Sequence, residues 1–66
     1  MDKEAIGRRL RELRGVFRTQ GEVADATGID RSKLSRYENG IAVPTDADKI
    51  ALAKYYGMTV GELFFE

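Results

Sequence analysis

Residues 20–40, QGEVADATGIDRSKLSRYENG, contain two short segments of helical character separated by a single glycine, Gly28. The second segment is basic and rich in hydroxyl groups. Two helices of this size bury little surface. When they cross at a steep angle over a glycine turn, however, the second helix can project from the domain. In DNA-binding proteins such a second helix enters the major groove. The stretch therefore predicts a helix-turn-helix, spanning about residues 19–39, with the rest of the chain as its scaffold.

The composition excludes several classes of protein. The chain has 66 residues, which predicts one domain over residues 1–66, and it contains neither cysteine nor histidine. A disulfide framework and a thiolate zinc site are thereby excluded, and the commonest general base and metal ligand is missing. Since no pair of acids converges on a pocket, we expect no enzyme, no metal and no cofactor, and no small-molecule ligand.

The sequence shows no sign of a membrane or secretory role. No apolar run approaches the length that spans a bilayer, and the first residues, MDKEAIGRR, lack the apolar region of a signal peptide. We therefore expect a cytoplasmic protein with no membrane partner.

The charge is distributed unevenly along the chain, although its net value is zero. Residues 1–40 hold nine basic and seven acidic residues, a balance of +2, whereas residues 41–66 hold two basic and four acidic residues, a balance of −2. The basic excess thus lies in the part that contains the predicted helix-turn-helix, as attraction to phosphates requires. Ordinary solvated helix charge explains the same distribution equally well.

Apolar periodicity and capping residues predict an all-α fold of five helices. The pairs Thr19–Glu22 and Thr59–Glu62 match the capping box, in which the glutamate reaches back to the backbone of the capping residue. Asp30 is a third candidate cap, and Thr45 precedes a fourth helix. The expected helices cover approximately residues 3–14, 20–27, 31–38, 46–56 and 60–64.

The helical period separates two faces of the third helix. Leu34, Tyr37 and Glu38 share one face, and we expect Leu34 and Tyr37 to be buried. The opposite face presents Arg31, Ser32, Ser35, Arg36 and Asn39. Arginine can bind guanine through two hydrogen bonds, and serine and asparagine can also bond base edges. Many solvated helix faces have the same composition, so this pattern alone is weak evidence.

Four motifs together match a known pattern. They are I-G-x-R-L-x-x-L-R at residues 6–14, T-Q-x-E-V-A at 19–24, G-I-D-R-S-x-L-S-R-Y-E-N-G at 28–40, and L-A-K-x-x-G-M-T-V-x-E-L-F at 52–64. Through them the chain resembles the Cro/cI repressor family of five-helix, lambda-repressor-like DNA-binding domains, the xenobiotic-response-element type. The resemblance covers nearly the whole chain.

The resemblance implies roles for individual residues. It implies base contacts from the third helix, through Arg31, Ser32, Ser35 and Arg36. It implies contacts to DNA phosphates from Gln20, Lys33, Asn39, the backbone of Gly40, and Arg18. It also implies a salt bridge between Arg14 and Glu38 that joins the first and third helices.

The sequence departs from the family pattern in the scaffold. The connection between the first two helices, residues 15–18, is one residue shorter than usual, which puts the placement of Phe17 and Arg18 in question. Asp46 and Lys49 stand at positions that are usually apolar. We therefore expect the remaining residues of the fourth helix to supply its packing, namely Ile50, Leu52, Ala53 and Tyr56.

The carboxyl-terminal segment has more aromatic residues than a small core can absorb. In the Cro/cI family, which this chain resembles, such a surface is often a homodimer interface. The resemblance therefore implies a dimer interface formed by Tyr55, Val60, Phe64 and Phe65. Core packing is the alternative for Phe64.

The whole pattern predicts a sequence-specific transcriptional regulator that binds double-stranded DNA. The favoured form is a repressor that occupies a two-fold operator as a homodimer. The alternative is an antitoxin or accessory module, whose main role is to bind a protein partner and whose DNA binding serves autoregulation.

Overall fold

Five α-helices, and no strand, form from residues 1–65, the part of the chain that this computed structural model describes. They are α1 (Lys3–Arg14), α2 (Gln20–Thr27), α3 (Arg31–Glu38), α4 (Asp46–Tyr55) and α5 (Val60–Phe64). The all-α prediction is confirmed. The fourth helix ends one residue earlier than expected, with Tyr56 as its cap.

Every helix begins at a side chain that accepts a hydrogen bond from the first turn; these caps are Asp2, Thr19, Asp30, Thr45 and Thr59. The capping box is complete at Thr59, whose N–H donates to Glu62 Oε1 at 2.9 Å. That bond, together with the one to the Thr59 side chain, lowers the pKa of the Glu62 carboxyl. At Thr19 only the hydroxyl half forms, since the Glu22 N–H donates to Thr19 Oγ1 at 3.1 Å. The expectation that Glu22 reaches back is therefore wrong.

The turn between α2 and α3 depends on the conformation of Gly28. Its φ of 76° lies in the left-handed region, and its N–H donates to the Ala24 carbonyl oxygen at 2.9 Å, which ends α2. A Cβ at this position would meet nothing within 4 Å. Glycine is thus favoured here by backbone conformation and not by lack of space.

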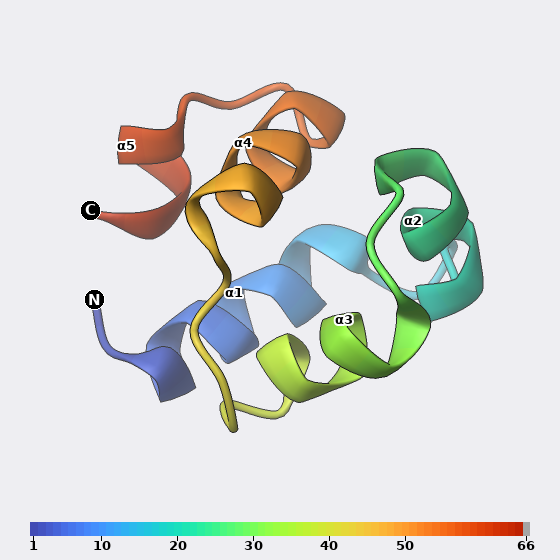
Figure 1. The fold of residues 1–66 in the computed structure, drawn as a ribbon, viewed down its shortest axis with the longest axis horizontal. Helices are drawn as coiled ribbons and strands as arrows, with labels where there is room; N and C mark the ends of the chain where they lie inside the picture. Colours follow the sequence, from blue (N-terminus) through green and yellow to red (C-terminus); the bar gives the residue numbers. More distant parts are fainter. Residues whose placement is uncertain (66) are drawn as a thin grey trace.

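All five helices contribute to one apolar core (Figure 1). Its buried residues are Ile6, Leu10, Val23, Ala24, Ile29, Leu34, Tyr37, Leu52, Ala53, Leu63 and Phe64. In the view of Figure 1, α1 and α3 lie below α4 and α5, and α2 closes the side away from the termini.

The packing of α4 differs from the expectation in one residue. Leu52 and Ala53 are buried, but Ile50 is 61% exposed and does not pack against the core. Two polar side chains of α4 also contact the rest of the fold. Asp48 accepts a hydrogen bond from the Tyr37 hydroxyl at 2.6 Å. Lys49 similarly extends its ammonium over the ring of Phe65, 5.0 Å from the ring centre.

The tightest contact at any glycine in the described part of the chain lies at Gly7, where α1 crosses the end of α3. A Cβ on Gly7 would stand 2.8 Å from the carbonyl oxygens of both Tyr37 and Glu38, and 3.0 Å from the Gly40 nitrogen. All three neighbours are backbone atoms, which cannot rotate away. Glycine at position 7 therefore sets how near α1 lies to α3.

We predict that Gly7→Ala destabilises the fold by about 1–3 kcal/mol, because the added methyl forces α1 and α3 apart. Gly21→Ala is the matched control: a Cβ there has Thr19 Oγ1 as its nearest neighbour, at 3.7 Å, and helix propensity favours alanine by about 1 kcal/mol. Urea unfolding followed by circular dichroism measures both. Equal stabilities for Gly7→Ala and the unmodified protein would contradict the close packing.

Candidate DNA interface

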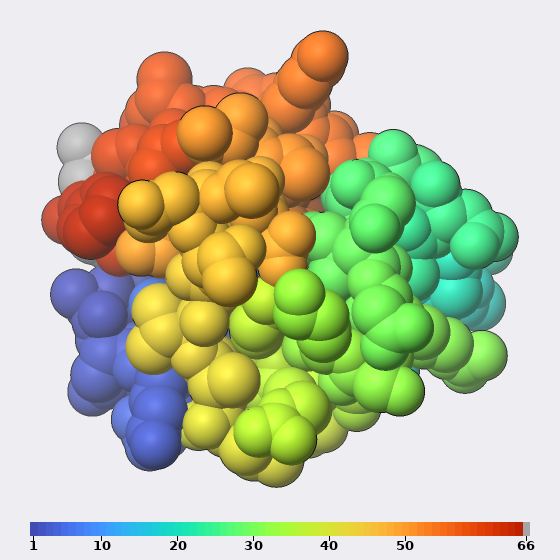
Figure 2. All heavy atoms as spheres, in the orientation of Figure 1, coloured from blue at the N-terminus to red at the C-terminus, as the bar shows by residue number. Residues whose placement is uncertain are grey.

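The exposed face of α3 is formed by Arg31, Ser32, Ser35 and Arg36, which we call the recognition face. Three of these are exposed and Ser35 is partly buried, whereas Leu34 and Tyr37 on the opposite side are 1% and 3% exposed. The predicted division of α3 into two faces is thus confirmed. The recognition face and Gln20 together line a shallow depression of the surface. In Figure 2 the residues of α3, in yellow-green, reach the surface below α4.

The position of α3 is fixed by a buried carboxylate on its inner side. Glu38 is 3% exposed, and its carboxylate accepts hydrogen bonds from Arg14 Nε at 2.9 Å and from Arg14 Nη2 at 2.9 Å. It also accepts a bond from Gln20 Nε2 at 3.0 Å. A single carboxylate therefore joins α1, α2 and α3. The predicted pairing of Arg14 with Glu38 is confirmed.

Arg14 also ties the α1–α2 connection to this network. Its Nη1 donates to the carbonyl oxygen of Arg18 at 3.0 Å. The hydrogen bond to Glu38 raises the pKa of Arg14 above its ordinary value, with desolvation opposing that effect. The guanidinium therefore remains charged at neutral pH, as its pairing with Glu38 requires.

A second polar contact joins α3 to α4. Burial, followed by the hydrogen bond to Asp48, raises the pKa of Tyr37, so its hydroxyl stays a donor at neutral pH. Lys33 Nζ lies 3.7 Å from the same carboxylate of Asp48. Lys33, for which a phosphate contact is expected, is thus an exposed residue with one acidic neighbour.

Gln20 stands at the first turn of α2, beside the recognition face. Its amide nitrogen is bonded to Glu38, and the side chain is partly buried. The bond to Glu38 fixes the orientation of the Gln20 amide. It uses the amide nitrogen and does not involve the amide oxygen.

Asn39, the cap of α3, is held by its neighbours at both ends of its amide. Its Nδ2 donates to the carbonyl oxygen of Ser35 at 2.9 Å and to Ser35 Oγ at 3.2 Å. Its Oδ1 accepts a hydrogen bond from Nη2 of Arg11, a residue of α1. The sequence motifs indicate no role for Arg11. Its spacing of four residues from Gly7 and three from Arg14, both of which contact α3, could have identified it.

The backbone of Gly40 is not available to a phosphate, contrary to the expectation. Gly40 is buried, and its N–H donates to the carbonyl oxygen of Tyr37 at 3.2 Å. A Cβ at this position would lie 3.2 Å from the Cα of Glu4, so α1 covers this backbone. Gly40, with a φ of 71°, reverses the chain after α3.

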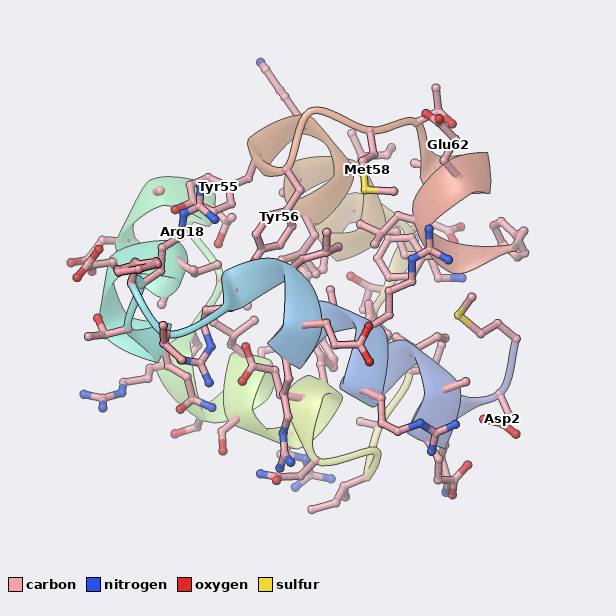
Figure 3. All side chains as sticks on the ribbon, turned by 180° about the vertical axis from the view of Figure 1, so that it is seen from behind. Asp2, Arg18, Tyr55, Tyr56, Met58 and Glu62 are labelled. Carbon is pink, nitrogen blue, oxygen red and sulfur yellow. The ribbon has the colours of Figure 1, made fainter. Side chains whose placement is uncertain are left out.

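Arg18 also departs from its expected role, because its side chain turns toward α4. Its guanidinium lies 5.6 Å from the ring centre of Tyr55 and 5.9 Å from that of Tyr56 (Figure 3). Its Nη1 donates to the carbonyl oxygen of Leu13 at 3.2 Å. Burial raises the pKa of Tyr56 to about 12, so this ring stays neutral beneath the cation. Arg18 therefore contacts the scaffold, and its side chain is engaged there instead of being held ready for a phosphate.

The expected dimer residues do not all lie on one exposed surface. Phe64 is 1% exposed and belongs to the core, because α5 packs that side of its helix against α4. Tyr55 contacts Tyr56 edge to face, with ring centres 4.9 Å apart, beside Arg18. Phe65 is 64% exposed, and Val60 is partly buried against the core. Phe64 is thus removed from the candidate interface, and Phe65 is its most exposed member.

Within residues 1–65, no three acidic, histidine or cysteine side chains gather as a metal site would require. In the same part of the chain, no helix is both long and apolar enough to cross a membrane.

We predict that Arg14→Met costs about 3–5 kcal/mol of stability, since it leaves the buried carboxylate of Glu38 without its cation. The double variant Arg14→Met/Glu38→Met should recover much of this loss, because it removes the buried charge as well. Arg8→Met, at an exposed position of α1, is the control. Urea unfolding measures all three. If Arg14→Met and Arg8→Met unfold at the same urea concentration, the pair does not hold the helices together.

The chain was also compared with known proteins. The family described as "Helix-turn-helix domain" matches residues 5–63, from the first turns of α1 into α5. Neither the curated proteins nor the solved structures gave a significant match. The match includes the glycine turn, α3 and the network around Glu38, and it agrees with the resemblance to Cro/cI-type regulators. The chain therefore belongs to the helix-turn-helix domain family.

Proposed function

We propose that this protein is a sequence-specific transcriptional regulator that binds double-stranded DNA as a homodimer and represses by covering promoter DNA. Membership of the helix-turn-helix family supports a DNA-binding regulator. The observation that carries the finer proposal is the recognition face, which places two arginines and two serines together on the outer side of α3. These are side chains that bond base edges in the major groove.

The arrangement of α3 suits entry into a groove. Its inner side is fixed by the core and by Glu38, so the outer side chains project from a rigid support. Gln20 lies beside them at the start of α2, where a contact to the DNA backbone would orient the helix. Lys33 and Asn39 lie at the edges of the same helix and belong to the same proposed contact region.

A homodimer suits the proposed two-fold operator, which has two half-sites. Two copies must present their recognition helices about 34 Å apart to enter successive major grooves on one side of the DNA. We place the dimer contact at α5, around Phe65 and Val60. Phe65 is a large exposed aromatic residue, and it directly follows α5, which is remote in sequence from the recognition face.

A role as an antitoxin or accessory module is the second candidate. The α1–α2 connection favours it, because Val16 and Phe17 are 90% and 93% exposed, and adjacent exposed apolar side chains suit a protein partner. Specific DNA binding fits both functions, so a partner protein bound through Val16 and Phe17 is what would favour the second.

We predict that Arg31→Ala and Arg36→Ala each weaken operator binding by about 1–3 kcal/mol and relax the preference at one base position per half-site. Selection of bound sites from random duplex DNA gives the operator, and titration with the selected duplex gives the affinities. Lys54→Ala, an exposed cation on α4, is the control and should leave the base preference unchanged. If the variant lacking all four side chains of the recognition face folds and still selects the same sequence, the proposed base contacts are wrong.

We predict that Phe65→Glu gives a folded monomer with much weaker operator binding, since a charge cannot be buried in an apolar contact between two copies. Ile50→Glu is the matched control, because Ile50 is exposed to a similar extent, 61% against 64%. Sedimentation equilibrium measures the mass of each variant. An intact dimer of Phe65→Glu, or a monomeric parent protein at high micromolar concentration, would exclude this interface.

A further inference from the structure

Resting on the proposed DNA binding, we propose that Arg11 of α1 contacts a DNA phosphate at the carboxyl-terminal end of the recognition helix, and that Asn39 positions it. This reverses the expected division of roles, in which Asn39 itself holds the phosphate.

The state of Asn39 is the first argument. Both hydrogen-bonding ends of its amide are already engaged, the nitrogen with two oxygens of Ser35 and the oxygen with Arg11. A phosphate oxygen needs a donor, and the amide nitrogen already has two acceptors for its two hydrogens. Asn39 is therefore suited to hold a neighbour in place.

The state of Arg11 is the second argument. A guanidinium has five N–H donors, and the hydrogen bond to Asn39 uses one of them. The two ion pairs found in residues 1–65 join Arg14 to Glu38 and Lys33 to Asp48, so neither neutralises Arg11. The side chain is exposed. Arg11 thus retains an uncompensated charge and several donors, which is what a bidentate contact to phosphate requires.

The location of Arg11 is the third argument. Ser32, Ser35 and Asn39 follow one another along the outer side of α3, so Asn39 marks the end of the recognition face. In a helix-turn-helix, the amino-terminal residues of the recognition helix contact the base edges in the major groove. A group just beyond the carboxyl-terminal end of α3 therefore lies toward the edge of the groove, where the phosphates are. Arg11 reaches that point from α1.

The test is the salt dependence of DNA binding, measured by fluorescence anisotropy with the selected operator duplex from 50 to 200 mM salt. Each phosphate contact contributes a slope of about −0.9 to log K against log salt concentration. Arg11→Gln should make the slope shallower by about 0.9 for each protomer bound, without changing the preferred sequence. Arg11→Lys, which keeps the charge, should retain most of the slope, and Lys54→Gln is the control for loss of a cation elsewhere.

The role of Asn39 is tested by a double-variant cycle. If Asn39 acts through Arg11, Asn39→Ala should weaken binding in the parent protein but add little in the Arg11→Gln background. A slope for Arg11→Gln equal to that of the parent, or additive effects of the two substitutions, would overturn the inference. Failure of the parent protein to select any DNA sequence would instead overturn the proposed function, so the two failures are distinguishable.

Discussion

The buried carboxylate of Glu38 is the constraint on which the placement of the recognition helix depends. A charge taken out of water is costly unless donors surround it, and here two nitrogens of Arg14 and one of Gln20 supply them. Because these donors come from α1 and α2, the carboxylate is satisfied in only one arrangement of the three helices. Such a pair contributes little to stability, because apolar side chains of similar volume would pack as well. Unlike them, it requires fixed distances between the helices, and so it fixes their arrangement.

A helix that must meet DNA has little surface left with which to hold itself in place. Only Leu34, Tyr37 and Glu38 of α3 are buried. Each of them holds α3 in place through a different contact. Leu34 packs in the core, Tyr37 donates to Asp48 on α4, and Glu38 accepts hydrogen bonds from α1 and α2. The close approach of α1 at Gly7 adds backbone packing where α3 ends. Short helices thus gain through specific contacts what they lack in buried area.

Local signals in the sequence were sufficient to predict the five helices and the two faces of α3. Caps such as Asp30 and Thr45 act within three residues, and the period that buries Leu34 is a property of the helix itself. Several of the errors depend on distant partners, whereas Glu22 fails to reach back across only three residues. Arg18 turns to Tyr55 of α4, Gly40 is covered by α1, and Phe64 packs inside because α5 lies against α4. Arg11 was missed for the same reason, since its partner Asn39 is 28 residues away.

The separation of the two sides of α3 also bears on how readily base preference could change. Arg31, Ser32 and Arg36 make none of the contacts that hold Glu38, so a different side chain at these positions leaves the support of the helix intact. Ser35 is different, because its carbonyl and hydroxyl oxygens both accept from Asn39. A substitution there keeps the carbonyl contact and loses the hydroxyl one, which alters the orientation of Asn39 and, through it, of Arg11. The recognition face is therefore independent of the scaffold at three of its four positions and coupled to it at the fourth.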